Sequence, residues 1–152
     1  GPIASPDEIL QLEKFPPKLR YFWSNGGMLN RSAFERLFSQ CPDLYEVRIT
    51  NYSGGDTKWL PSFSQLAELR FLYLNNTNLS DEELLDCVLS LPKLYYFNAS
   101  GTAFSSNSLL ALGQHPNLNQ IVIGNCSNIN ADAVAEFRKL YPNCSLILEF
   151  EN

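Results

Sequence analysis

The sequence predicts an α/β solenoid, with a curved parallel sheet on its concave side and short helices on its convex side. Three observations in the 152 residues predict this fold. A proline or alanine returns every 24 to 26 residues, a fixed apolar pattern follows it, and an apolar helical face follows that pattern. One such unit cannot bury its strand and its helix alone, whereas stacked units enclose both in a continuous core.

The strand half of each unit follows an L-x-x-L-x-L pattern. The units start at Pro17, Pro42, Ala67, Pro92 and Pro116. Two positions later every unit carries a leucine, namely Leu19, Leu44, Leu69, Leu94 and Leu118. The next two pattern positions are mostly apolar, namely Phe22, Val47, Leu72, Phe97 and Ile121, then Ser24, Ile49, Leu74, Ala99 and Ile123. This alternation predicts short strands with these residues in the core, as in a leucine-rich repeat.

The helical half follows in most units. Residues spaced three and four apart form one helical face, as in Phe34, Leu37, Phe38, then Trp59, Ser62, Phe63, then Leu84, Cys87, Val88, then Leu109, Leu112, then Val134, Phe137. Ser80 and Glu83 predict a capping box at the start of one helix. Residues 53–63 are irregular, because Gly54-Gly55 and Pro61 favour a short helix or a 3₁₀ turn over a full helix.

These elements set the domain boundaries. Residues 1–16 form an N-terminal cap, in which Gly1-Pro2 resembles the remnant of a cleaved tag. The five repeats occupy residues 17–41, 42–66, 67–91, 92–115 and 116–141. Residues 142–152 supply a C-terminal capping strand whose facing is open, since its alternation is one residue out of register with the repeats. Glu149 and Glu151 would protect its edge.

The turns and strand starts resemble one particular repeat family. The residues that carry the resemblance are segments 41–44, 77–84 and 126–134, which match C-P-x-L and the C-x-x-I-T-D-x-x-L turn, with Thr77 in place of one Cys. The sequence thus resembles the cysteine-containing, ribonuclease-inhibitor-like leucine-rich repeats, as in F-box leucine-rich-repeat proteins. The resemblance implies a binding scaffold: an adaptor or substrate-recognition module of a ubiquitin ligase or another intracellular complex.

Composition and motifs argue against other functions. The net charge of −5 and pI of about 4.8 oppose a general nucleic-acid binder. No apolar run is long enough to cross a membrane. Neither phosphate-binding loops nor nucleophile motifs occur, His115 has no nucleophile near it in sequence, and the four cysteines lack C-x-x-C spacing. We therefore expect no enzyme, no cofactor and no metal, and buried cysteines in a cytoplasmic or nuclear protein.

The asparagines suggest a second location. Seven Asn-x-Ser/Thr sequons occur, at Asn30, Asn51, Asn75, Asn78, Asn98, Asn125 and Asn143. That surplus leaves a secreted or cell-surface glycoprotein module as an alternative. Most of these residues fall in turns or at strand ends, where asparagine tolerates unusual backbone angles, so we favour a structural reason for the surplus.

The strand residues between the core positions predict the binding site. Alternate strand residues point to opposite faces, so these residues lie on the concave face. The predicted partner-binding residues are Tyr21, Trp23, Glu46, Arg48, Arg70, Phe71, Tyr73, Tyr96, Asn98 and Gln120. Tyr, Trp and Arg are enriched at protein-binding hot spots, which favours a protein or peptide ligand. We expect Trp23, Phe71, Tyr73 and Tyr96 to anchor that ligand, and Arg48 and Arg70 to pair with its acidic residues.

Several readings of the same residues stay open. The aromatic residues could serve as a stabilising ladder across the strands, or be covered by a flank of the native chain. They could also stack unpaired bases of RNA, although the acidic pI opposes this reading. A homodimer through the terminal strand edge is a further alternative.

Overall fold

The computed structural model describes residues 13–26, 31–52 and 60–148. Within these residues a six-stranded, all-parallel sheet alternates with four helices, which confirms the predicted α/β class. The strands are β1 (Tyr21–Asn25), β2 (Glu46–Thr50), β3 (Phe71–Tyr73), β4 (Tyr96–Asn98), β5 (Gln120–Val122) and β6 (Ser145–Ile147). The helices are α2 (Arg31–Gln40), α3 (Asp81–Leu89), α4 (Ser106–Leu112) and α5 (Ala131–Leu140).

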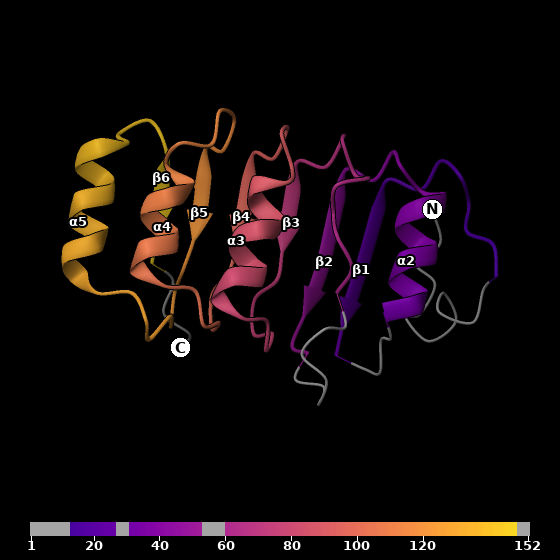
Figure 1. The fold of residues 1–152 in the computed structure, drawn as a ribbon, viewed down its shortest axis with the longest axis horizontal. Helices are drawn as coiled ribbons and strands as arrows, with labels where there is room; N and C mark the ends of the chain where they lie inside the picture. Colours follow the sequence, from indigo (N-terminus) through magenta and orange to yellow (C-terminus); the bar gives the residue numbers. More distant parts are fainter. Residues whose placement is uncertain (1–12, 27–30, 53–59, 149–152) are drawn as a thin grey trace.

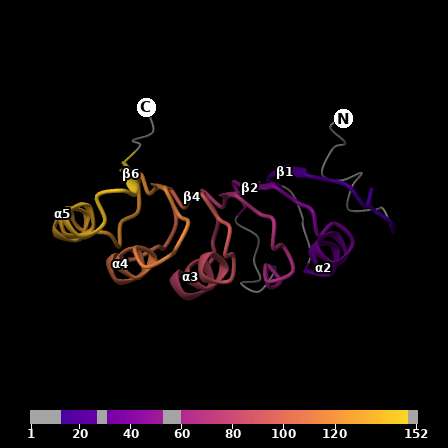
Figure 2. The same cartoon turned by 90° about the horizontal axis from the view of Figure 1, so that it is seen from above.

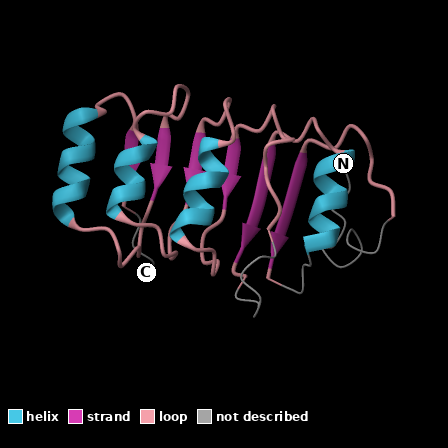
Figure 3. Ribbon diagram, viewed as in Figure 1, coloured by secondary structure: helices cyan, strands magenta, loops and turns pink. Residues whose placement is uncertain are grey.

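The strands follow one another across the sheet in the order of the chain, from β1 to β6 (Figure 1). Figure 3 shows the strands side by side along the long axis of the molecule, with their arrows pointing the same way. Seen from above, the four helices lie on one side, and the strands lie along the inner side of a shallow arc (Figure 2). No described helix therefore covers the inner face of the sheet.

The core row of the sheet matches the predicted pattern. Parallel pairing in register aligns Phe22, Val47, Leu72, Phe97, Ile121 and Leu146. All six side chains are buried. The pairing also settles the facing of the closing strand: Leu146 lies opposite Ile121 and points into the core. Pro142 is thus one residue closer to the core residue of its strand than the first residue of each earlier unit is.

The predicted helical faces are buried in α2, α3, α4 and α5. The unit at residues 42–66 differs, because no helix occurs in the part of it that the structure describes. Phe63 and Leu66 are nevertheless buried, and the Phe63 ring lies 4.8 Å from the Phe38 ring of the neighbouring unit. The described part of this segment therefore fills its share of the core without a helix. The short helix or 3₁₀ turn expected over residues 53–63 is not tested at residues 53–59, which lie outside the described residues. Trp59 lies outside the described residues.

The capping box at the start of α3 is confirmed. The Ser80 hydroxyl accepts a hydrogen bond from the backbone N–H of Glu83 at 3.1 Å. A Glu83 carboxylate oxygen in turn accepts one from the backbone N–H of Ser80 at 2.9 Å. These bonds satisfy two N–H groups that a helix start otherwise leaves without partners.

Replacing Ser80 with alanine should lower the free energy of unfolding by about 1 kcal/mol, because one N–H at the start of α3 loses its acceptor. Urea unfolding followed by circular dichroism measures the change. Glu82→Gln is the matched control, since Glu82 lies in the same turn and takes no part in the cap. Equal destabilisation by both changes would show that the loss at Ser80 is not specific to the cap.

One turn position in every repeat has a left-handed backbone. In the part of the chain that the structure describes, the residues with positive φ are Gly26, Asn51, Asn76, Gly101 and Asn125, with φ between 55° and 71°. They stand nine residues after the start of their units. Glycine and asparagine are the residue types that adopt this conformation most readily. The structural explanation for the asparagine surplus is therefore confirmed at Asn51 and Asn125.

Candidate functional site

The sheet face opposite the helices carries the candidate site, and we call it the open face. It consists of the first and third residues of each strand from β1 to β5, namely Tyr21, Trp23, Glu46, Arg48, Phe71, Tyr73, Tyr96, Asn98, Gln120 and Val122. The parallel register places them in two rows across the sheet, one starting at Tyr21 and the other at Trp23. The structure thus brings together the residues that the strand alternation grouped, and Arg70 directly precedes β3 at the edge.

Aromatic rings form a continuous cluster over β1 to β4. The Phe71 ring is central, with centroid distances of 5.4 Å to Tyr45 and 6.0 Å to Tyr96. Tyr96 lies 4.7 Å from Tyr73 in the other row. Such ring pairs add stability beyond their buried area, so part of this cluster supports the sheet itself.

Arg48 occupies the centre of the second row. Its guanidinium carbon lies 4.5 Å from the Trp23 ring centroid and 4.1 Å from that of Tyr73. Its Nε also forms an ion pair with Glu46. Two rings and one carboxylate thus already satisfy the charge of Arg48. Its role in this arrangement is to hold the rings of Trp23 and Tyr73 in position.

Exposure differs along the open face. Tyr21 and Trp23 are exposed, at 53% and 46% of their full surface. Phe71, Tyr73, Tyr96 and Gln120 are half-buried. Glu46 and Asn98 are buried, and the Asn98 side-chain oxygen accepts a hydrogen bond from the backbone N–H of Ser100. Both therefore offer little surface to a partner and instead orient their neighbours.

A recess borders the open face where the first three strands begin. Its volume is about 480 Å³. It is lined by Lys18, Arg20, Asp43, Tyr45, Glu68 and Arg70. Of these, only Arg70 belonged to the predicted site. The repeat spacing could have indicated Arg20 and Tyr45 as well, because residues 20, 45 and 70 occupy the same position of their units, directly before a strand.

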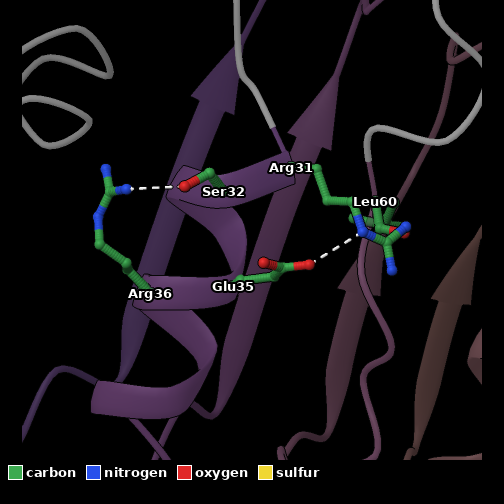
Figure 4. A network of polar contacts seen from close by, with 5 residues as sticks. All are labelled: Arg31, Ser32, Glu35, Arg36 and Leu60. Atoms are coloured by element: carbon green, nitrogen blue, oxygen red, sulfur yellow. Dashed lines mark hydrogen bonds and ion pairs between the residues drawn. The ribbon is translucent and has the colours of Figure 1, made fainter.

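A second recess, of about 540 Å³, lies on the helical side between α2 and residues 61–65. Figure 4 shows its polar contacts: Arg31 pairs with Glu35 at 2.9 Å, and Arg36 donates to the Ser32 hydroxyl at 3.0 Å. Arg31 also donates to the carbonyl of Leu60. The first two contacts lie within α2, and the third joins α2 to the unit that lacks a described helix, so these contacts have a structural role.

His115 has a structural role in a turn. Its Nδ1 accepts from the backbone N–H groups of Asn117 and Leu118, at 3.1 and 3.0 Å. Nε2 therefore carries the hydrogen and donates to the Leu91 carbonyl at 2.7 Å. In the preceding units the equivalent amides, those of Leu69 and Leu94, donate to a backbone carbonyl instead. The imidazole replaces that carbonyl.

The cysteines are free thiols. Cys41, Cys87 and Cys126 are buried, and Cys144 is half-buried. Burial raises the pKa of Cys87 to about 12 and the pKa values of Cys41 and Cys144 to about 11. Thiols with such values are weak nucleophiles at neutral pH. Among the described residues, no group of His, Cys, Asp or Glu side chains is placed to hold a metal ion.

The sequons differ in their suitability for modification. The Asn51 amide nitrogen donates to the Asn25 side-chain oxygen at 2.7 Å, and its oxygen accepts from Asn76 at 2.9 Å. Asn98 is buried. A glycan on the amide nitrogen of Asn51 or Asn98 would break these contacts or require new space. Asn78, Asn125 and Asn143 are exposed, and Asn30 lies outside the described residues.

None of the described helices has the length and apolar character needed to cross a lipid bilayer. Comparison of the chain with protein-family models and with curated proteins finds no match.

Proposed function

We propose that this protein is a non-enzymatic recognition domain, built as a leucine-rich-repeat solenoid, that binds a protein or peptide on its open face. The observation that carries the proposal is the ring cluster around Arg48. Laddering accounts for the half-buried rings, but a stabilising ladder does not require Tyr21 and Trp23 to remain about half exposed. Exposed aromatic side chains next to arginine are typical of binding hot spots.

The rigidity of this cluster supports the same function. Ordering side chains on binding costs about 0.5–1.5 kcal/mol for each rotamer-rich group. Trp23 and Tyr73 are already held against Arg48, which Glu46 anchors from the same strand. A partner would therefore meet a surface whose side chains have already lost much of their freedom.

The repeat geometry supports the solenoid. Strand partners in adjacent units are 24 or 25 residues apart throughout the sheet. The resemblance to F-box leucine-rich-repeat proteins and the free thiols favour an adaptor or substrate-recognition role inside the cell. The accessible sequons keep a secreted module as the alternative.

Peptides selected from a random displayed library on the immobilised full chain test the binding role. The Trp23→Ala/Phe71→Ala variant should bind the selected peptides at least about thirtyfold more weakly, because hot-spot truncation costs roughly 2 kcal/mol or more. Fluorescence anisotropy with a labelled peptide measures the loss.

The control is Leu89→Ala/Leu140→Ala, which removes two exposed apolar side chains from the helical side. It should bind like the wild type. Thermal melts of both variants check that each remains folded. Equal affinities for the two double variants, or a library that yields no binder, would reject the open face as the binding site.

A further inference from the structure

We propose that the partner segment is acidic and that Arg20 and Arg70 pair with two of its carboxylates at the starting edge of the strands. This inference rests on the proposed function and gives the partner a chemistry. It moves the acid-binding role away from Arg48, whose charge is already satisfied by Glu46, Trp23 and Tyr73.

The charges on this side of the molecule oppose those of the whole chain. The chain carries −5. Among the described residues of the open face and its starting edge, the cations are Lys18, Arg20, Arg48, Arg70 and Lys93, and the anions are Asp43, Glu46 and Glu68. Cations therefore outnumber anions here, and a local positive field remains on an acidic protein.

The ion pairs show which cations remain available. Arg48 pairs with Glu46, and Lys93 pairs with Glu68 at 2.8 Å. Within the described part of the chain, neither Arg20 nor Arg70 forms an ion pair, and both are exposed. Lys93 lowers the pKa of Glu68, with smaller contributions from Arg70 and Arg20. The two arginines thus already favour the charged form of a carboxylate at this edge.

The position of these arginines joins the charged edge to the ring cluster. The Arg20 guanidinium lies 4.9 Å from the centroid of the Tyr45 ring. The Tyr45 ring lies 5.4 Å from the Phe71 ring. Arg20 and Tyr45 line the recess where the first three strands begin, and Phe71 belongs to the open face that borders it. A segment in the recess would meet cations and an aromatic surface together, which suits acidic residues placed next to apolar ones.

Strand spacing gives the expected separation of the acids. Arg20 and Arg70 belong to units separated by one strand, so their backbones are about 10 Å apart at the usual spacing of roughly 4.8 Å per strand. A peptide in the polyproline II conformation has three residues per turn and advances about 3.1 Å per residue, so carboxylates three residues apart lie on the same side and span roughly this distance. The preferred motif therefore has an Asp or Glu at its first and fourth positions, with an apolar residue at one of the two positions between them.

A protein segment suits this edge better than a nucleic acid. The cations are confined to the units of the first four strands, and the corresponding position of the fifth unit is Asn119. A nucleic-acid strand needs a basic track along its length and meets repulsion from the remaining negative charge. Two guanidinium groups about 10 Å apart match discrete carboxylates.

Displayed peptides selected on the full chain test this inference at the sequence level. They should be enriched in two acidic residues three positions apart. Arg70→Glu should weaken their binding about tenfold, a typical loss for one interfacial charge pair. Lys139→Glu, an exposed change of equal charge on α5, should leave the affinity within about twofold. A peptide with lysine in place of one acid should bind Arg70→Glu better than wild type.

Each other outcome is decisive. Two results would overturn this inference and leave the proposed function standing, provided that the Trp23→Ala/Phe71→Ala variant binds the selected peptides more weakly. The first is that the selected peptides carry no acidic residues. The second is that they bind the Arg70→Glu variant as tightly as the wild type. Peptides indifferent to both changes would overturn both. A single-stranded oligouridine that binds wild type more tightly than the best peptide, and loses binding in Arg70→Glu, would replace the acidic segment with RNA.

Discussion

Replacing Phe97 with alanine should lower the free energy of unfolding by about 3–5 kcal/mol. Phe97 is fully buried at the centre of the sheet, with Leu72 and Ile121 as its cross-strand partners. Its ring also meets Phe104 edge-on at 5.7 Å, so its loss leaves a cavity among large neighbours. Domains of this size are stable by only about 5–15 kcal/mol, so this single change removes much of the total.

The control for this prediction is the neighbouring residue of the same strand. Tyr96→Ala removes a ring of similar size from the open face, where it is half-buried. We expect a loss of about 1 kcal/mol, mainly from its ring contacts with Phe71 and Tyr73. Urea titrations of both variants give the difference. Similar losses at residues 96 and 97 would mean that the two faces of β4 are not distinct.

The contrast between Phe97 and Tyr96 shows what could be predicted from the sequence. Strand alternation and the repeat spacing together define which residues face the core, because a one-residue slip would place every side chain on the wrong face. The same apolar pattern recurs in five units of the sequence, and each occurrence independently indicates the same register. Where that redundancy ends, the prediction weakens: Pro142 is displaced by one residue, and only the pairing of Leu146 with Ile121 shows the facing of β6.

The roles of residues on the open face were less predictable. Sequence alternation placed Arg48 on that face, but an arginine there can pair with a partner or with its neighbours. Its actual contacts depend on residues 25 positions away on both sides, Trp23 and Tyr73, and on Glu46 two positions earlier. Side-chain pairing of this kind depends on rotamers that spacing does not determine. The same limit applies to His115, whose ring replaces a backbone acceptor.

Replacing Gly101 with alanine should lower the free energy of unfolding by about 2–3 kcal/mol, through two separate effects. A left-handed backbone, here with φ of 67°, is strained for any residue with a Cβ atom. The new Cβ would also lie 2.1 Å from the side-chain oxygen of Asn76, so that amide must rotate. Rotation breaks the 2.9 Å hydrogen bond from Asn76 to Asn51 that links adjacent turns.

Gly26→Ala separates these effects. Gly26 has almost the same backbone, with φ of 71°, but among the described residues its added Cβ would meet only the backbone oxygen of Asn51, at an ordinary 3.7 Å. Alanine there should cost only the backbone strain, about 1 kcal/mol. Chemical denaturation of the two variants gives the steric part of the Gly101 effect as their difference.

A double-mutant cycle with Asn76→Gly then identifies the source of that difference. Glycine keeps the left-handed backbone at position 76 and removes the amide that the new Cβ would strike. In this background Gly101→Ala should cost no more than Gly26→Ala does in the wild type, giving a coupling energy of about 1–2 kcal/mol. Absence of coupling would show that the turn yields without disturbing Asn76. The asparagine contacts would then be a consequence of the repeat and not part of what holds its turns together.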